Sequence, residues 1–150
     1  GYAASGESML WCRDRFAFTD AAAEMKIDVP LPSNAKPWLN LEHSLGFEPS
    51  LDFGTFELAC WDGGFLEYST VTGATWRDAG SLIGGGQTYH EVIENNLANF
   101  NSNHPAFGYE SHGYVSTRLD LSAPAGQSIR FRWHTSTDSP VSGPVWLGIG

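Results

Sequence analysis

The chain has 150 residues, a length that suits one domain burying roughly 70% of its unfolded surface. Its 17 Asp and Glu against 8 Lys and Arg give a formal net charge of −9, which repels nucleic-acid phosphates and anionic lipid headgroups. Since it also lacks a run of about 18 apolar residues, we expect neither a nucleic-acid partner nor membrane insertion.

The first quarter of the chain carries the earliest strand signals. Residues 10–18 are predicted to form a strand, and residues 19–23 a connection. Apolar and polar side chains alternate along residues 25–31, which predicts a strand with one buried face. Residues 33–37 (SNAKP) are predicted to turn.

Residues 38–47 alternate again and predict a long strand. Its apolar face is expected to hold Leu39, Leu41, His43, Leu45 and Phe47. For His43 we expect a core histidine with one satisfied hydrogen bond, rather than a ligand or a catalytic base.

A β-hairpin is predicted over residues 62–78 (DGGFLEYSTVTGATWRD). It begins with a tight Asp-Gly-Gly turn, because Gly tolerates positive φ and Asp caps its own backbone. Residues 65–70 alternate as a strand, residues 71–73 turn the chain, and residues 74–76 begin a second short run. The acidic stretch before the hairpin, residues 48–61, is predicted as a loop, with a short strand over residues 55–58 as the alternative.

The second half of the chain shows further short strands. Residues 81–87 (SLIGGGQ) are predicted as a flexible turn, and the glycines are not a Walker loop because no Lys-Ser/Thr pair follows them. Strands are predicted at residues 88–93, 114–121, 128–135 and 145–149. The succession of short strands, rich in Gly and aromatic residues, predicts a single all-β domain over residues 1–150, an antiparallel two-sheet β-sandwich.

Three phrases of the chain, LPSNAKPWLNLEHSLGFE, DGGFLEYSTVTGATWRDAGSLI and PAFGYESHGYVSTRLDLSAPAGQSIRFRWHTSTDS, together resemble bacterial extracellular jelly-roll domains. Such domains accompany secreted metallopeptidases of the immune-inhibitor-A and fungalysin-like kinds and are similar to the MAM domain. The resemblance covers residues 25–146. It implies a jelly-roll, concanavalin- or MAM-like sandwich that serves as a non-catalytic accessory module of a larger secreted protein.

Several residues stand where the family's phrases have theirs: His43, Glu48, Asp62, Glu67, Trp76, Asp120 and Asp138. Members often hold a structural cation between an early acidic residue and a late aspartate, and the closing segment of this chain lacks that aspartate pair. Ca²⁺ requires six to eight oxygen ligands. Glu48, Asp52 and Asp62 are the candidate set for a structural Ca²⁺, and the alternative is a solvated loop whose carboxylates cap turns.

Two groups of side chains are candidates for ligand binding. Trp38, Trp61 and Tyr109 form the candidate platform of a carbohydrate-binding module, and core or inter-domain packing is the alternative. Arg130, Arg132 and His134 form a basic stripe on the outward face of residues 128–135, either for a ligand or for pairing with neighbouring carboxylates.

Motifs for hydrolysis are absent from the sequence: the five His lack HExxH spacing, and no GxSxG occurs. A small hydrolase with an unrecognised carboxylate pair stays a third alternative. Cys12 and Cys60 either form a disulfide or are two buried thiols. Residues 1–11 (GYAASGESMLW) lack the basic and apolar regions of a signal peptide, so we expect a mature product or a fragment of a secreted protein, contacting neighbouring domains or an extracellular glycan or protein.

Overall fold

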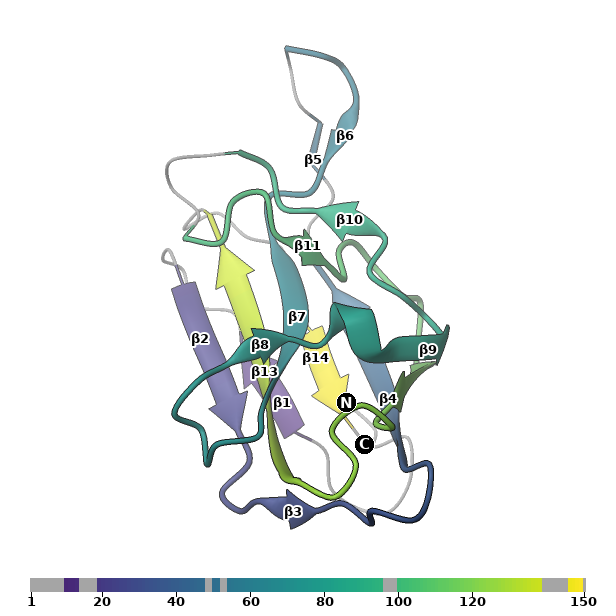
Figure 1. Ribbon diagram of the computed structural model, residues 1–150. Coiled ribbons are helices and arrows are strands. Elements are labelled where there is room, and N and C mark those ends of the chain that lie inside the picture. The colour runs from purple at the N-terminus through teal and green to yellow at the C-terminus, as the bar shows by residue number, and fades with distance from the viewer. Residues whose placement is uncertain are drawn as a thin grey trace.

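The computed structural model describes residues 10–13, 19–47, 50–51, 54–95, 100–138 and 146–149. In these residues the chain is all-β, and all of the strand pairings are antiparallel (Figure 1). The described helical structure is one 3₁₀ turn, η1 (Gly80–Leu82). None of the described helical structure is long and apolar enough to cross a membrane.

Two larger sheets form the body of the domain. Sheet A has the strand order β1 (Leu10–Arg13), β14 (Trp146–Ile149), β4 (Trp38–Gly46), β12 (Val115–Asp120) and β9 (Ile83–Gly86). Sheet B has the order β2 (Thr19–Glu24), β13 (Ser128–Thr137), β7 (Gly63–Ser69) and β8 (Arg77–Asp78), and β3 (Val29–Pro30) pairs with the start of β13. Two small hairpin-like pairs complete the fold: β5 (Ser50–Leu51) with β6 (Leu58–Ala59), and β10 (Glu91–Val92) with β11 (Pro105–Ala106).

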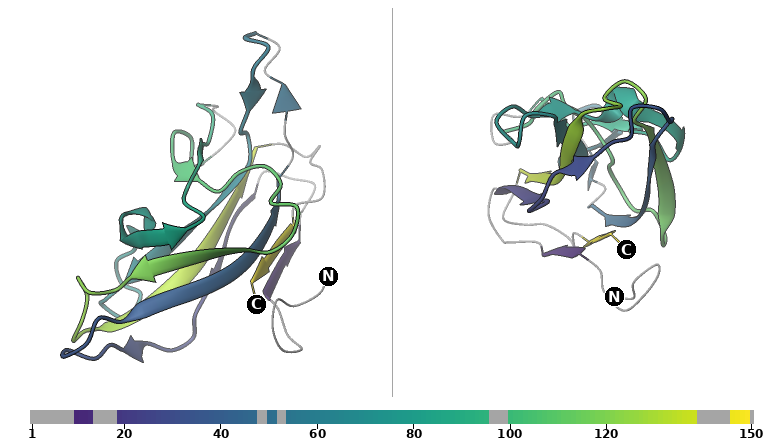
Figure 2. Two further views of the ribbon diagram at one scale, coloured as in Figure 1. Left: turned by 90° about the vertical axis from the view of Figure 1, so that its right-hand side faces the viewer. Right: turned by 60° about the horizontal axis from the view of Figure 1, so that its bottom comes forward.

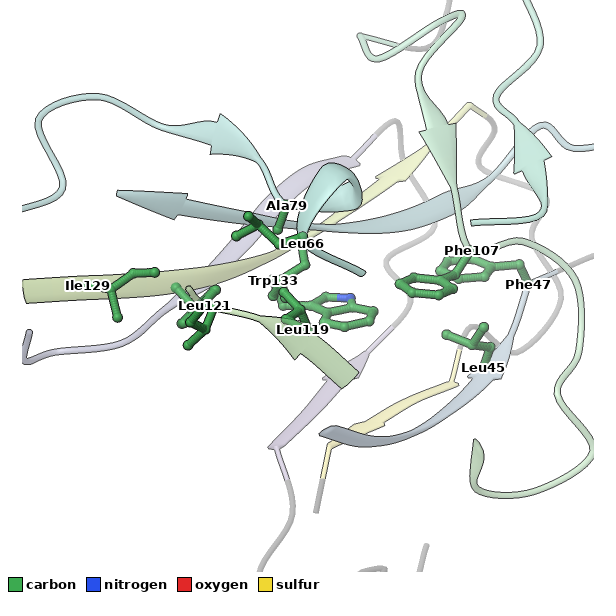
Figure 3. Close-up of a cluster of buried hydrophobic side chains, with 11 residues drawn as sticks. Leu45, Phe47, Leu66, Ala79, Phe107, Leu119, Leu121, Ile129 and Trp133 are labelled. Atoms are coloured by element: carbon green, nitrogen blue, oxygen red, sulfur yellow. The ribbon is translucent and has the colours of Figure 1, made fainter. Parts of the chain in front are cut away.

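The hydrophobic core lies between the two sheets, which face each other as a β-sandwich (Figure 2). Leu45 and Leu119 come from sheet A, and Leu66 and Trp133 come from sheet B (Figure 3). Phe107 stacks on the Trp133 indole with ring centroids 5.6 Å apart and an interplanar angle of 10°. Every second residue of β4, β12 and β13 therefore contributes to one common core.

The strongest alternation in the sequence gave correct predictions. The strand over residues 38–47 is β4, whose C-terminal half buries His43, Leu45 and, just beyond it, Phe47. The hairpin over residues 62–78 is β7–β8, with Glu67 opposite Asp78. The second strand of the hairpin, β8, begins at Arg77, one residue after the end of the run predicted over residues 74–76.

Several sequence predictions are wrong. Residues 63 and 64, expected in a tight turn, begin strand β7 and have no positive φ. Residues 19–23, expected to be a connection, belong to strand β2. The strand expected over residues 25–31 shrinks to the two residues of β3, and Ile27, expected in the core, is 69% exposed. Residues 81–87, expected to be a flexible turn, contain the end of η1 and strand β9, which pairs with β12.

Candidate functional site

The candidate aromatic platform is divided between opposite ends of β4. Trp38 begins the strand, is 44% exposed, and has the guanidinium carbon of Arg118 5.3 Å above its ring. At the other end of the strand, the backbone N–H of Phe47 donates to the carbonyl of Tyr109, at 3.0 Å. Nine residues of extended chain span about 30 Å. Trp38 and Tyr109 therefore do not share a flat binding surface.

Trp61 and Tyr109 instead belong to one end of the sandwich, which we call the loop end: β5, β6, β10, β11 and residues 60–62 and 107–112 (Figure 1). Tyr109 has a positive φ of 56°. Burial, and then the nearby Glu91 carboxylate, raise the pKa of the Tyr109 phenol to about 12. The phenol also hydrogen-bonds Glu91, so its ring is held at this rim.

Cys60 lies in the same end as a free, buried thiol. Its Sγ–H donates to the backbone carbonyl of Asp62, at 3.2 Å. Burial, and then the negative charges of Glu91, Asp62 and Glu94, raise the pKa of the thiol to about 12. Of the two alternatives for Cys60, disulfide or buried thiol, the structure has the buried thiol.

The loop end is uniformly acidic. Residues 54–62 and 87–113 contain no Lys or Arg. The carboxylates in these two segments are Glu57, Asp62, Glu91, Glu94 and Glu110. The backbone N–H of Glu94 donates to the carbonyl of Cys60, at 2.9 Å, so the acidic segment after β10 lies directly beside the base of the β5–β6 hairpin.

The β5–β6 hairpin projects away from the sandwich (Figure 2) and carries exposed apolar side chains. Leu51 is opposite Leu58 in the register, and these side chains are 50% and 61% exposed. Phe56, in the connection between the strands, is 77% exposed. The sequence predicted a loop here, with a short strand over residues 55–58 as the alternative, and did not predict an apolar projection. The signal was a series of large apolar residues, Leu51, Phe53, Phe56 and Leu58, within an otherwise acidic segment.

The predicted Ca²⁺ set is only partly described. Glu48 and Asp52 lie outside the described residues. Asp62 is buried, and its Oδ1 accepts a hydrogen bond from the backbone N–H of Asp138, at 2.9 Å. In the described part of the chain, no three His, Cys, Asp or Glu side chains gather as metal ligands. The Ca²⁺ site stays a prediction.

The basic stripe lies on the outer face of sheet B and is ion-paired. Arg130 on β13 donates through Nε to Asp28, at 2.8 Å, and through Nη1 to Glu24, at 2.9 Å. These hydrogen bonds, to Glu24 first and then to Asp28, raise the pKa of the Arg130 guanidinium. The first residue of the stripe therefore ties β13 to the edge of sheet B.

The other two residues of the stripe share one carboxylate. Arg132 Nε donates to Glu67 at 2.5 Å, and the Arg132 guanidinium carbon lies 4.5 Å from the centroid of the Trp76 ring. His134 Nε2 lies 2.6 Å from Asp20, and its Nδ1 lies 3.2 Å from the same Glu67. The stripe thus pairs with neighbouring carboxylates, as one of the two sequence interpretations expected.

A shallow hollow of about 330 Å³ lies beside η1. It is lined in part by Asp78, Ser81, Thr88 and Tyr89. The Asp78 Oδ1 accepts from the Gly80 N–H at 2.7 Å, and the Tyr89 hydroxyl accepts from the Leu66 N–H at 2.9 Å. The Asp78 carboxylate and the Tyr89 hydroxyl therefore already accept hydrogen bonds from the protein's own backbone.

Comparison with known proteins does not assign this chain to a family. No family model matches the chain, and no solved structure matches it. The chain is similar to the multifunctional protein pyrABCN of Emericella nidulans, with 26% identity over 109 residues. That segment is 72% of this chain and 5% of the other protein, so the chain spans a small fraction of the relative's length.

Proposed function

We propose that this chain is a non-catalytic accessory module of a secreted multidomain protein, built on a jelly-roll, MAM-like sandwich. Its role is to contact a neighbouring domain or an extracellular ligand. The all-β sandwich and the acidic surface are compatible with this role. The resemblance of three sequence phrases to extracellular accessory domains supplies the family expectation.

The observation that carries the proposal is the β5–β6 hairpin. It presents Leu51, Phe56 and Leu58 to solvent beyond the body of the sandwich (Figure 1). Clustered exposed apolar side chains on a soluble domain are typical of interaction sites. The basic stripe is a poorer candidate, because neighbouring carboxylates already pair with Arg130, Arg132 and His134.

Site-directed photo-crosslinking in the natural protein tests this role. A photoreactive phenylalanine analogue is placed at Phe56, and in a matched variant at Ile27, which is 69% exposed and lies between β2 and β3. We expect the analogue at position 56 to form a crosslink to another domain or another macromolecule, and the one at position 27 to form none. Equal crosslinking at the two positions, or none at either, contradicts the proposal.

Sugar binding is the second candidate, and the position of Tyr109 favours it. The ring lies at the rim of the loop end and is hydrogen-bonded to Glu91, an arrangement in which an aromatic face and a polar acceptor are adjacent. A glycan array tests it, with Tyr109→Ala beside Trp38→Ala as the control at the other end of β4. Glycan signals that Tyr109→Ala removes and Trp38→Ala retains would favour this alternative.

A further inference from the structure

We propose that the β5–β6 hairpin inserts its apolar tip into an apolar pocket on a protein partner, and that Lys and Arg side chains line the rim of that pocket. This inference rests on the proposed function and adds the chemistry of the partner. It is drawn from the exposure, the backbone geometry and the charge of the loop end.

The exposed apolar side chains of the β5–β6 hairpin are suited to fill a pocket on a partner. Leu51 and Leu58 are directly opposite each other, and Phe56 is 77% exposed between the two strands. Two residue pairs form the hairpin, and isolated two-stranded hairpins are marginally stable in water. Docking would remove its three large apolar side chains from water. Aromatic and aliphatic anchors that enter a pocket dominate protein–protein binding energies.

The backbone at Phe56 has an unusual conformation. Phe56 has a φ of 60°, a left-handed conformation that is rare and strained for a bulky residue. The Thr55 hydroxyl accepts a hydrogen bond from the backbone N–H of Glu57, at 3.3 Å, across this residue. Strained backbone of this kind gathers at binding sites, and a preset conformation lowers the entropy lost on binding.

The negative charge around the hairpin indicates the charge that the partner's surface would carry. Glu57 lies between Phe56 and Leu58 in the sequence, and Glu94 is hydrogen-bonded through its backbone N–H to Cys60 at the base of the hairpin. No Lys or Arg occurs in residues 54–62 or 87–113 to offset these carboxylates. An anionic lipid surface would be repelled, whereas a Lys- and Arg-rimmed pocket is electrostatically complementary.

A pair of amphipathic helical peptides tests this inference with the intact chain. One peptide has a Leu face and a Lys face, and the other has Glu in place of every Lys. We expect the Leu/Lys peptide to bind at least about tenfold more tightly, and the Phe56→Ser/Leu58→Ser double variant to lose about tenfold of that affinity. The control Ile27→Ser should change it less than about twofold.

The electrostatic part of the inference is tested by reversing the charge of Glu57 while the apolar side chains of the hairpin are kept. Glu57→Lys should weaken the Leu/Lys peptide and strengthen the Leu/Glu peptide. Equal binding of the two peptides, or binding that the double variant leaves unchanged, overturns the inference. Binding to phosphatidylcholine vesicles in preference to the Leu/Lys peptide, or self-association lost in the double variant, would assign another occupant and overturn it too.

The two proposals can fail separately. A crosslink at position 56 without preference for the basic peptide would keep the accessory role and reject a Lys- and Arg-rimmed partner. Preference for the basic peptide without a crosslink in the natural protein would reject the docking role itself. In that case the peptide would report only the acidic, apolar character of the hairpin.

Discussion

The imidazole Nε2 of His43 lies 2.8 Å from the hydroxyl oxygen of Thr117, with both side chains buried between the sheets. The Thr117 hydroxyl in turn donates to the backbone carbonyl of Gln87, at 2.7 Å. A hydroxyl has one proton to donate, so it must accept from His43, and His43 Nε2 therefore carries the hydrogen. This network joins β4, β12 and the residue after β9 around a neutral histidine.

The neutral state of His43 makes stability depend on pH. Burial lowers the pKa of His43 to about 4, and the charge of His90 is the second cause. A histidine in the unfolded chain has a pKa of about 6.5. The unfolded state therefore takes up the proton first. The stability that His43 contributes is complete above about pH 6.5 and is lost as the pH falls toward 4.

Urea denaturation at pH 7.5 and pH 4.5 checks this prediction. We expect the wild type to lose about 2 kcal/mol more than His43→Gln over this interval, since the variant has no imidazole to protonate. His112, whose side chain is 82% exposed, supplies the control His112→Gln, which should keep the wild-type pH dependence. The same pH dependence in His43→Gln and the wild type would contradict a neutral core histidine.

Glu67 is expected to stabilise sheet B through its charge. The Glu67→Gln variant replaces the carboxylate that accepts from Arg132 with a neutral amide, which loses the attraction between opposite charges and weakens the contact with His134. We expect a loss of about 1–3 kcal/mol in the free energy of unfolding, measured by denaturant titration. The control Glu57→Gln, on the exposed hairpin, should change it by less than about 0.5 kcal/mol. Equal effects would show that the ion-paired stripe contributes no stability.

Strand β9 places a specific demand on Gly86. Its φ is 76°, and a Cβ built there would lie 2.2 Å from the carbonyl oxygen of Ser116 in β12. Gly86→Ala should therefore cost about 2 kcal/mol or more in thermal or denaturant unfolding. Gly85→Ala is the matched control, because its Cβ would meet the movable end of Arg118. If both variants are equally stable, residues 81–87 form the flexible turn and not a strand.

Cys60 is expected to be reduced and unreactive in the folded protein. With a pKa of about 12 the thiol is almost wholly protonated at neutral pH, and it is also buried. Without reductant, iodoacetamide should alkylate Cys60 slowly in the native protein and quickly in urea, as followed by peptide mass mapping. A peptide in which Cys60 is disulfide-linked to Cys12 would contradict the free thiol.

The sequence predicted the strands that bury one face in the middle of a sheet. Alternation along β4 and β13 is a direct consequence of packing one side of each strand against the core, so Leu45 was placed correctly on the buried face of β4 and Arg130 and Arg132 on the outer face of β13. His43 was also predicted as a core residue, because it shares the apolar face of β4.

The edge of sheet B could not be predicted in this way. Strand β2 reads TDAAAE, and most of its residues are exposed, so no burial pattern marks it. Conversely, Met25, Ile27, Val29 and Leu31 alternate in the sequence, yet Ile27 lies in a bend and is 69% exposed. Alternation alone therefore does not distinguish the buried face of a strand from apolar residues that lie in a bend between two strands.

The candidate site depended on contacts between distant segments. Trp61 and Tyr109 were singled out from the sequence as a platform with Trp38, but β4 places Trp38 at the opposite end from Tyr109. The pairing of Arg132 and His134 with Glu67 follows from the β13–β7 register, which the sequence does not reveal. The apolar tip of the β5–β6 hairpin was missed, because the sequence predicted only a loop there, with a short strand over residues 55–58 as the alternative.

Hydrogen–deuterium exchange of residues 50–59 tests the docking claim most directly. The exchange rates of these amides are compared between the isolated chain and the same segment in the natural protein. We expect the β5–β6 amides to exchange at least about tenfold more slowly in the natural protein, because docking covers the hairpin. Equal exchange rates in the two samples, with the core amides of β4 and β13 protected in both, would contradict it.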